Sequence, residues 1–145
     1  MLAFLDGRPF TTGMARFSDH ANSQADTAEI YVRIELHGFG APLLAQLDTG
    51  ATWSVLNAEV AAELLLLDGD GEPIRLATRH GVVDGRLEEV GLTIVAEDGR
   101  SLEVQAVVFV SPEWYDRTFL GYRGLLERIR FALDPQESEF HFGGY

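Results

Sequence analysis

The sequence predicts a mostly-β domain, either a closed barrel or a sandwich, on three observations. Short runs of alternating or continuously apolar residues recur along the chain. Turns rich in glycine, aspartate and proline separate these runs, and only two short stretches have helical spacing. The 145 residues, of which 46% are hydrophobic, are enough for one domain with its own core.

The first strands are predicted after a less regular beginning. We interpret residues 1–28 as an N-terminal arm and linker that packs as an extra strand, covers a cleft or carries a processing site, and residues 29–145 as the domain. Residues 29–36 alternate, with Ile30, Val32, Ile34 and Leu36 on one face. A turn at 37–40 and a second strand at 42–47 complete a hairpin.

A short return strand beginning at Val55 leads into the first helical stretch. Asn57 is a good N-cap, and apolar residues recur at helical spacing for about ten residues before the turn at 68–71. The later part of the chain predicts three hairpins and one further helical turn. Their ranges are 74–78 with 86–90, 92–96 with 102–110, 131–133 with 139–142, and 125–129 for the helical turn.

Composition excludes several classes of function. The net charge is −12 and all 11 basic residues are arginine, so we expect binding neither to nucleic acid nor to a membrane surface. We find no apolar run of membrane-spanning length and no secretory signal, and therefore expect a cytoplasmic protein. There is no cysteine, and the four histidines lack metal-ligand spacing, so we expect no metal and no cofactor. No nucleophile-elbow pattern supports a serine hydrolase.

The most informative segment is Leu47-Asp48-Thr49-Gly50-Ala51, directly after an apolar strand. A strand end can direct a carboxylate out of the fold, and glycine leaves its N–H free to donate to a carboxylate oxygen. Gln46 shares a strand face with Asp48 and is a candidate for lining a pocket. A three-residue match can arise by chance, so the alternative interpretation is a polar loop after a strand.

These residues resemble the active-site loop of aspartic proteases, above all the retropepsins. The order of strands, helix, glycine-bearing hairpin and Phe119-Leu120-Gly121 is similar to that family over roughly residues 29–142. The resemblance implies a retropepsin-like closed β-barrel, the acid protease half-fold, with one or two short helices and a flap hairpin. It also implies that Asp48 is the catalytic carboxylate, that Thr49 braces the loop across a dimer axis, and that Gly50 approaches the carboxylate closely, while Ala51 follows the family pattern.

In that family a flap hairpin closes over an extended polypeptide substrate. The corresponding residues here are expected to form a flexible tip in which the two glycines permit bending: His80, Gly81, Val82, Val83, Asp84 and Gly85. We interpret His80 as a solvated turn residue in preference to a substrate contact. We interpret Trp53 as a core residue in preference to a pocket residue.

One carboxylate cannot both accept a proton from water and donate one to the peptide carbonyl. The other Asp-Gly pairs do not follow an apolar strand and look like turns; they begin at Asp6, Asp68, Asp70, Asp84 and Asp98. We therefore expect a homodimer in which a two-fold axis brings together two copies of Asp48. The protein is then an aspartic endopeptidase.

Two positions depart from the retroviral pattern. Thr52 and Tyr122 stand where an Asp and an Arg form an ion pair in that family, so dimer support must come from elsewhere, with the aromatic residues of 131–142 as candidates. Loss of both partners leaves no unpaired buried charge. The alternative function is an inactive retropepsin-fold module that dimerises and binds extended peptide without cutting it.

Overall fold

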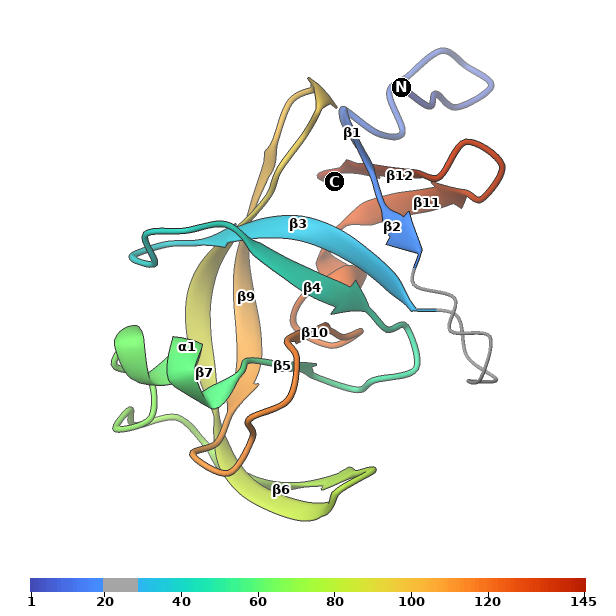
Figure 1. Ribbon diagram of the computed structural model, residues 1–145. Coiled ribbons are helices and arrows are strands. Elements are labelled where there is room, and N and C mark those ends of the chain that lie inside the picture. Colours follow the sequence, from blue (N-terminus) through green and yellow to red (C-terminus); the bar gives the residue numbers. More distant parts are fainter. Residues whose placement is uncertain (20–28) are drawn as a thin grey trace.

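The computed structural model describes residues 1–19 and 29–145, and it confirms a mostly-β fold built on a closed barrel (Figure 1). Six strands follow one another around the barrel, and pairing between β3 and β7 closes it. In barrel order they are β3 (Ile30–Leu36), β4 (Leu43–Leu47), β10 (Phe119–Leu120), β5 (Ser54–Val55), β9 (Leu102–Val110) and β7 (Gly81–Ile94).

The alternating pattern of the first strand is reproduced in its burial. Val32, Ile34 and Leu36 are at most 2% exposed, whereas Arg33 and Glu35 between them face solvent. Burying each such aliphatic side chain contributes about 1.5 to 3 kcal/mol. The barrel interior is therefore fixed by the period-two pattern that predicted the strand.

The flap-like hairpin has a shorter tip than expected. β6 (Pro73–Thr78) pairs with β7 from Pro73 opposite Arg86 to Thr78 opposite Gly81, which leaves only residues 79–80 in the turn. The prediction of a flexible tip over residues 80–85 is therefore wrong, because Gly81 to Gly85 belong to a strand. Gly85 is small for packing reasons, since a Cβ there would lie 2.4 Å from the carbonyl oxygen of Val110.

A second sheet of four strands lies beside the barrel, at the end where both termini are found (Figure 1). Its order is β11 (Arg130–Asp134), β12 (Glu139–Gly143), β1 (Gly13–Arg16) and β8 (Asp98–Gly99). β2 (Ser18–Asp19) pairs with β3, and Ala15 and Phe17 belong to the core. Of the roles considered for the arm, its described part packs as extra strands. The rest of the arm, residues 20–28, and the boundary at residue 28 lie outside the described residues.

The aromatic residues of the last hairpin were expected to be candidates for contact with a second copy, but they pack within their own chain. Phe140 and Phe142 are fully buried in the core of their own chain, with ring centroids 5.5 Å apart. Phe131 is partly buried and packs on Phe140 at 6.2 Å. β1 pairs with β12, and Ala15 and Phe17 belong to the same core cluster as Phe140 and Phe142, so these aromatic residues are buried within one chain.

The helical content is small in the described residues. α1 (Ala58–Glu63) begins as predicted at Asn57, whose side chain accepts a hydrogen bond of 2.8 Å from the N–H of Glu59. It has six residues in place of about ten, and Leu65 just beyond it has a positive φ of 59°. A 3-10 turn, η1 (Leu126–Arg128), replaces the second helix. No helix in residues 1–19 and 29–145 is long and apolar enough to cross a bilayer.

Candidate active site

Asp48 is the first residue after β4, and the backbone of its loop fixes it. Its N–H donates to the carbonyl of Leu120 in β10 over 3.0 Å, and its own carbonyl accepts from the N–H of Ala51 at 3.2 Å. Its Oδ1 accepts from the N–H of Gly50 at 3.0 Å. The carboxylate is half-buried and Thr49 and Gly50 are exposed. The glycine thus serves the role that the sequence suggested, a backbone donor beside the carboxylate.

The segment that follows β10 is hydrogen-bonded to this loop. The N–H of Tyr122 donates to the carbonyl of Ala51 at 2.8 Å, and the N–H of Arg123 donates to the carbonyl of Thr52 at 2.7 Å. The side chains of Thr52 and Tyr122 are exposed. Backbone hydrogen bonds therefore join the two loops at the positions where an ion pair was missing from the sequence.

The glycine of the Phe119-Leu120-Gly121 pattern packs directly against the backbone that follows the Asp48 loop. A Cβ on Gly121 would lie 2.4 Å from the carbonyl carbon and oxygen of Trp53, which is backbone that cannot move aside. The N–H of Gly121 donates to Oγ of Ser54 at 2.9 Å, and Ser54 is 1% exposed. The Asp48 loop is thus supported by a buried crossing of two backbones.

A cavity of about 450 Å³ lies between the Asp48 loop and the hairpin of β6 and β7. Asp48 and Gln46 line one side, residues 76–79 of the hairpin line the opposite side, and an apolar wall closes the space. The wall consists of Val55, Trp114 and Phe119, with Trp53 and Leu76 partly buried against them. Trp53 therefore lines the cavity and also packs on the smaller core cluster, so the two interpretations of it are not exclusive.

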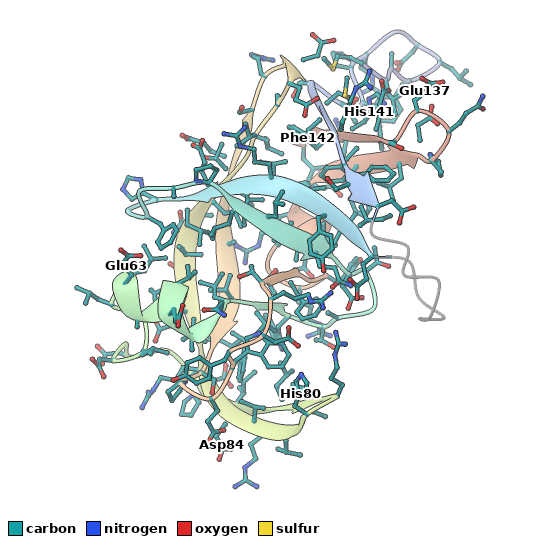
Figure 2. All side chains as sticks on the ribbon, viewed as in Figure 1. Glu63, His80, Asp84, Glu137, His141 and Phe142 are labelled. Carbon is teal, nitrogen blue, oxygen red and sulfur yellow. The ribbon has the colours of Figure 1, made fainter. Side chains whose placement is uncertain are left out.

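None of the predicted flap residues 80–85 lines this cavity, to which the hairpin contributes residues 76–79. Figure 2 shows His80 on the inner side of the hairpin and Asp84 at its outer side. Val82 and Asp84 are exposed, with Asp84 paired to Arg75 at 2.9 Å, whereas Val83 is buried in the core cluster that includes Trp114. A substrate-binding role for the hairpin stays a prediction.

His80 has two partners and is not simply solvated. Its Nε2 lies 3.0 Å from Oδ2 of Asp116, and its ring centroid lies 5.7 Å from that of Trp114. The hydrogen bond from His80 lowers the pKa of Asp116, and Arg117 lowers it further, against the opposing effect of burial. His80 is thus an exposed turn residue, as interpreted, with 57% of its side chain exposed, and it also contacts Asp116 and Trp114.

Arg117 is the main residue at the site that the sequence did not point to. Its guanidinium lies 2.5 Å from Glu29 and 3.2 Å from Oε1 of Gln46, donates to the hydroxyl of Tyr31, and lies over that ring. The hydrogen bond from Arg117 lowers the pKa of Glu29, and burial raises the pKa of Tyr31. Gln46, which lines the cavity, thereby lies beside a positive charge that Glu29 compensates.

Residues 1–19 and 29–145 contain no group of three or more His, Asp or Glu placed to hold a metal ion.

Comparison with known proteins identifies the fold. No protein-family model matches the chain, and no curated protein matches it in sequence. Among solved structures, it is similar to a retropepsin-like aspartic protease from Rickettsia conorii, with a TM-score of 0.58 and 17% identity over 90% of this chain and 98% of that one. The chain therefore has the retropepsin-like fold, as its sequence predicted.

Proposed function

We propose that the protein is an aspartic endopeptidase, active as a homodimer in which two copies of Asp48 activate one water molecule. The observation that carries this proposal is the placement of Asp48: a carboxylate with a backbone N–H on Oδ1, facing a cavity beneath a hairpin. The retropepsin-like fold and the protease named among the similar structures support it.

The reaction needs two carboxylates that share one proton. Because two like charges a few ångströms apart do not both ionise, the paired state holds one Asp48 as the acid and the other as the base. The ionised carboxylate takes a proton from water, the protonated one donates to the peptide carbonyl oxygen, and the new C–O bond gives a tetrahedral intermediate. In the collapse that breaks the C–N bond, the now protonated Asp48 donates its proton to the leaving amine and the ionised Asp48 takes a proton from a hydroxyl of the intermediate, which restores the singly protonated pair.

Thr49 and Gly50 are exposed in the single chain, which leaves the tip of the loop accessible to a second copy. In the proposed dimer Thr49 braces the two loops across the axis. The cavity wall of Trp114, Phe119 and Val55 would take apolar side chains of an extended polypeptide, while the hairpin covers it.

Asp48→Asn tests the proposal. The substitution keeps the size of the side chain and the acceptor for Gly50, but removes the acid and base, so cleavage of a peptide library at pH 4 to 7 should fall to background. Circular dichroism and sedimentation should show an unchanged fold and dimer. Wild-type cleavage by pure Asp48→Asn protein contradicts the assignment, as does a monomer that stays monomeric with substrate.

The second candidate is a module of the same fold that dimerises and binds extended peptide without hydrolysing it. It is favoured by the exposed Thr52 and Tyr122, which do not supply the ion pair found in retroviral members. Peptide binding by the wild type without any cleavage across the same pH range would favour this function over the first.

A further inference from the structure

The tip of the flap hairpin is anchored on the segment that precedes β10 in its own chain. His80 Nε2 lies 3.0 Å from Asp116 Oδ2, and the imidazole packs on Trp114. Trp114 and the adjacent hairpin residues line the cavity that Asp48 faces. The contact therefore joins the hairpin tip, within one chain, to the segment that carries Trp114 beside this cavity.

Asp116 is the fixed partner in this contact. Its Oδ1 accepts from the N–H of Arg117 at 2.7 Å, and its backbone carbonyl accepts from Nδ2 of Asn57, the N-cap of α1, at 2.9 Å. Only 27% of its side chain is exposed. The second oxygen, Oδ2, is thus held in place facing the hairpin.

His80 is the partner that can move. It belongs to a two-residue turn, and its N–H donates to Oγ1 of Thr78 within the hairpin. The next residue, Gly81, has a φ of +101°, and a Cβ built there would meet nothing within 4 Å. The tip therefore has open space around it, and the contact with Asp116 is its polar attachment to the barrel.

The strength of this contact depends on the charge of the imidazole. A hydrogen bond between a carboxylate and an imidazolium is roughly twice as strong as one between neutral groups. Asp116 is the charged group that His80 contacts, Arg79 and Arg117 act on Asp116, and Glu29 before β3 lies against Arg117. Glu29 is paired with Arg117, which leaves Asp116 as the carboxylate that His80 contacts.

We propose that Asp116 is a positioning residue that keeps the flap tip closed over the Asp48 cavity of its own subunit, through the imidazole of His80, most strongly in mildly acidic solution. The effect of this closure on catalysis rests on the proposed function, whereas the contact between His80 and Asp116 does not depend on it. An imidazole gains its charge in mildly acidic solution, where a carboxylate is still ionised, so the charge-assisted form of such a contact belongs to that range. The lowered pKa of Asp116 keeps its carboxylate ionised further into acid.

The test is hydrogen exchange of the full-length protein without substrate, followed by mass spectrometry on a peptide spanning residues 76–84. Exchange rates are corrected for their intrinsic pH dependence. In Asp116→Asn we expect exchange in this peptide to be several-fold faster than in the wild type at pH 5.5. At pH 8 we expect a much smaller difference, because the Asn oxygen still accepts from a neutral imidazole.

Two further variants separate the contact from a general loosening of the hairpin. His80→Gln removes the titratable partner, so its exchange should be fast at both pH values, and adding Asp116→Asn should accelerate it no further. Asp84→Asn is the matched control, since it removes an exposed ion pair with Arg75 from the same hairpin while leaving the tip attached. It should exchange as the wild type does.

The proposal is overturned if Asp116→Asn exchanges at the wild-type rate at pH 5.5, if the effects of the two substitutions add, or if Asp84→Asn accelerates exchange equally. A peptidase assay then tests the positioning role: Asp116→Asn should raise KM several-fold at pH 5.5 with little change in kcat. An unchanged KM overturns that role. Absence of cleavage by the wild type contradicts the proposed function instead, and the exchange data still decide on the contact.

Discussion

The backbone N–H of Gly50 donates to Oδ1 of Asp48 over 3.0 Å, and a Cβ at position 50 would lie only 3.3 Å from the same oxygen. The residue after Thr49 is therefore small because it must approach the carboxylate and present its N–H to it. This relationship links a three-residue sequence motif to the electrostatics of one carboxylate oxygen, since a backbone donor stabilises the ionised form.

Gly50→Ala should weaken the proposed catalysis more than it weakens the fold. The added methyl group displaces the carboxylate by a few tenths of an ångström and lengthens the hydrogen bond, so we expect kcat/KM to fall about 10-fold, equivalent to about 1.4 kcal/mol. The unfolding midpoint should change little at this exposed loop. Gly40→Ala is the control, because a Cβ at this exposed turn residue meets nothing within 4 Å. Equal activity of both variants would contradict the expectation.

Arg117→Met should change the pH dependence of stability. Arg117 lowers the pKa of Glu29 through a hydrogen bond and contributes to the lowered pKa of Asp116. A lowered carboxyl pKa gives stability that is fully present above the unfolded-state value, near pH 4, and is lost as pH falls through the folded-state value. The variant should therefore unfold at lower urea than the wild type at pH 7, and the two midpoints should converge below about pH 4.

Arg128→Met provides the comparison for this titration. Its guanidinium donates to the backbone carbonyl of Gln105 at 2.6 Å, and that acceptor does not titrate. Its effect on the urea midpoint should therefore be the same at pH 7 and at pH 3. A constant difference between wild type and Arg117→Met over this range would show that the ion pair with Glu29 contributes nothing to the stability.

The barrel was predictable because its signal is local. The alternation from Ile30 to Leu36 becomes the buried face of β3, and Asn57 caps α1 as its side chain suggested. The flap turn was misplaced because glycine has two uses: Gly85 looked like part of a turn but lies against Val110 in a strand.

The cluster that Arg117 forms with Glu29, Tyr31 and Gln46 could not be predicted because its members are distant in the sequence. Arg117 is 86 residues from Tyr31 and 71 from Gln46, and no periodic pattern joins them. The same reason hid the contact of His80 with Asp116, 36 residues apart. β1 was not predicted because its four residues lie between turn-forming neighbours. It forms a strand because it pairs with β12.

Phe17→Ala tests whether the described part of the arm belongs to the fold. Phe17 is 9% exposed and lies in the main core cluster, so truncation should lower the free energy of unfolding by about 3 to 5 kcal/mol. Arg16→Ala is the control at the neighbouring exposed position, with an expected change within about 0.5 kcal/mol. Urea denaturation followed by circular dichroism measures both, and a Phe17→Ala protein as stable as Arg16→Ala would mean that the arm is dispensable.

Ser54→Ala tests the crossing that supports the Asp48 loop. Oγ of Ser54 is the acceptor for the N–H of Gly121 at 2.9 Å, and both residues are buried. Removing it leaves a buried donor unpaired, so the free energy of unfolding should fall by about 1 to 3 kcal/mol. Ser101→Ala removes a similar hydrogen bond, from the N–H of Ala96, but at an exposed turn where water replaces it, so it should cost less than about 0.5 kcal/mol. Equal losses in urea denaturation would show that burial of this crossing does not strengthen the loop.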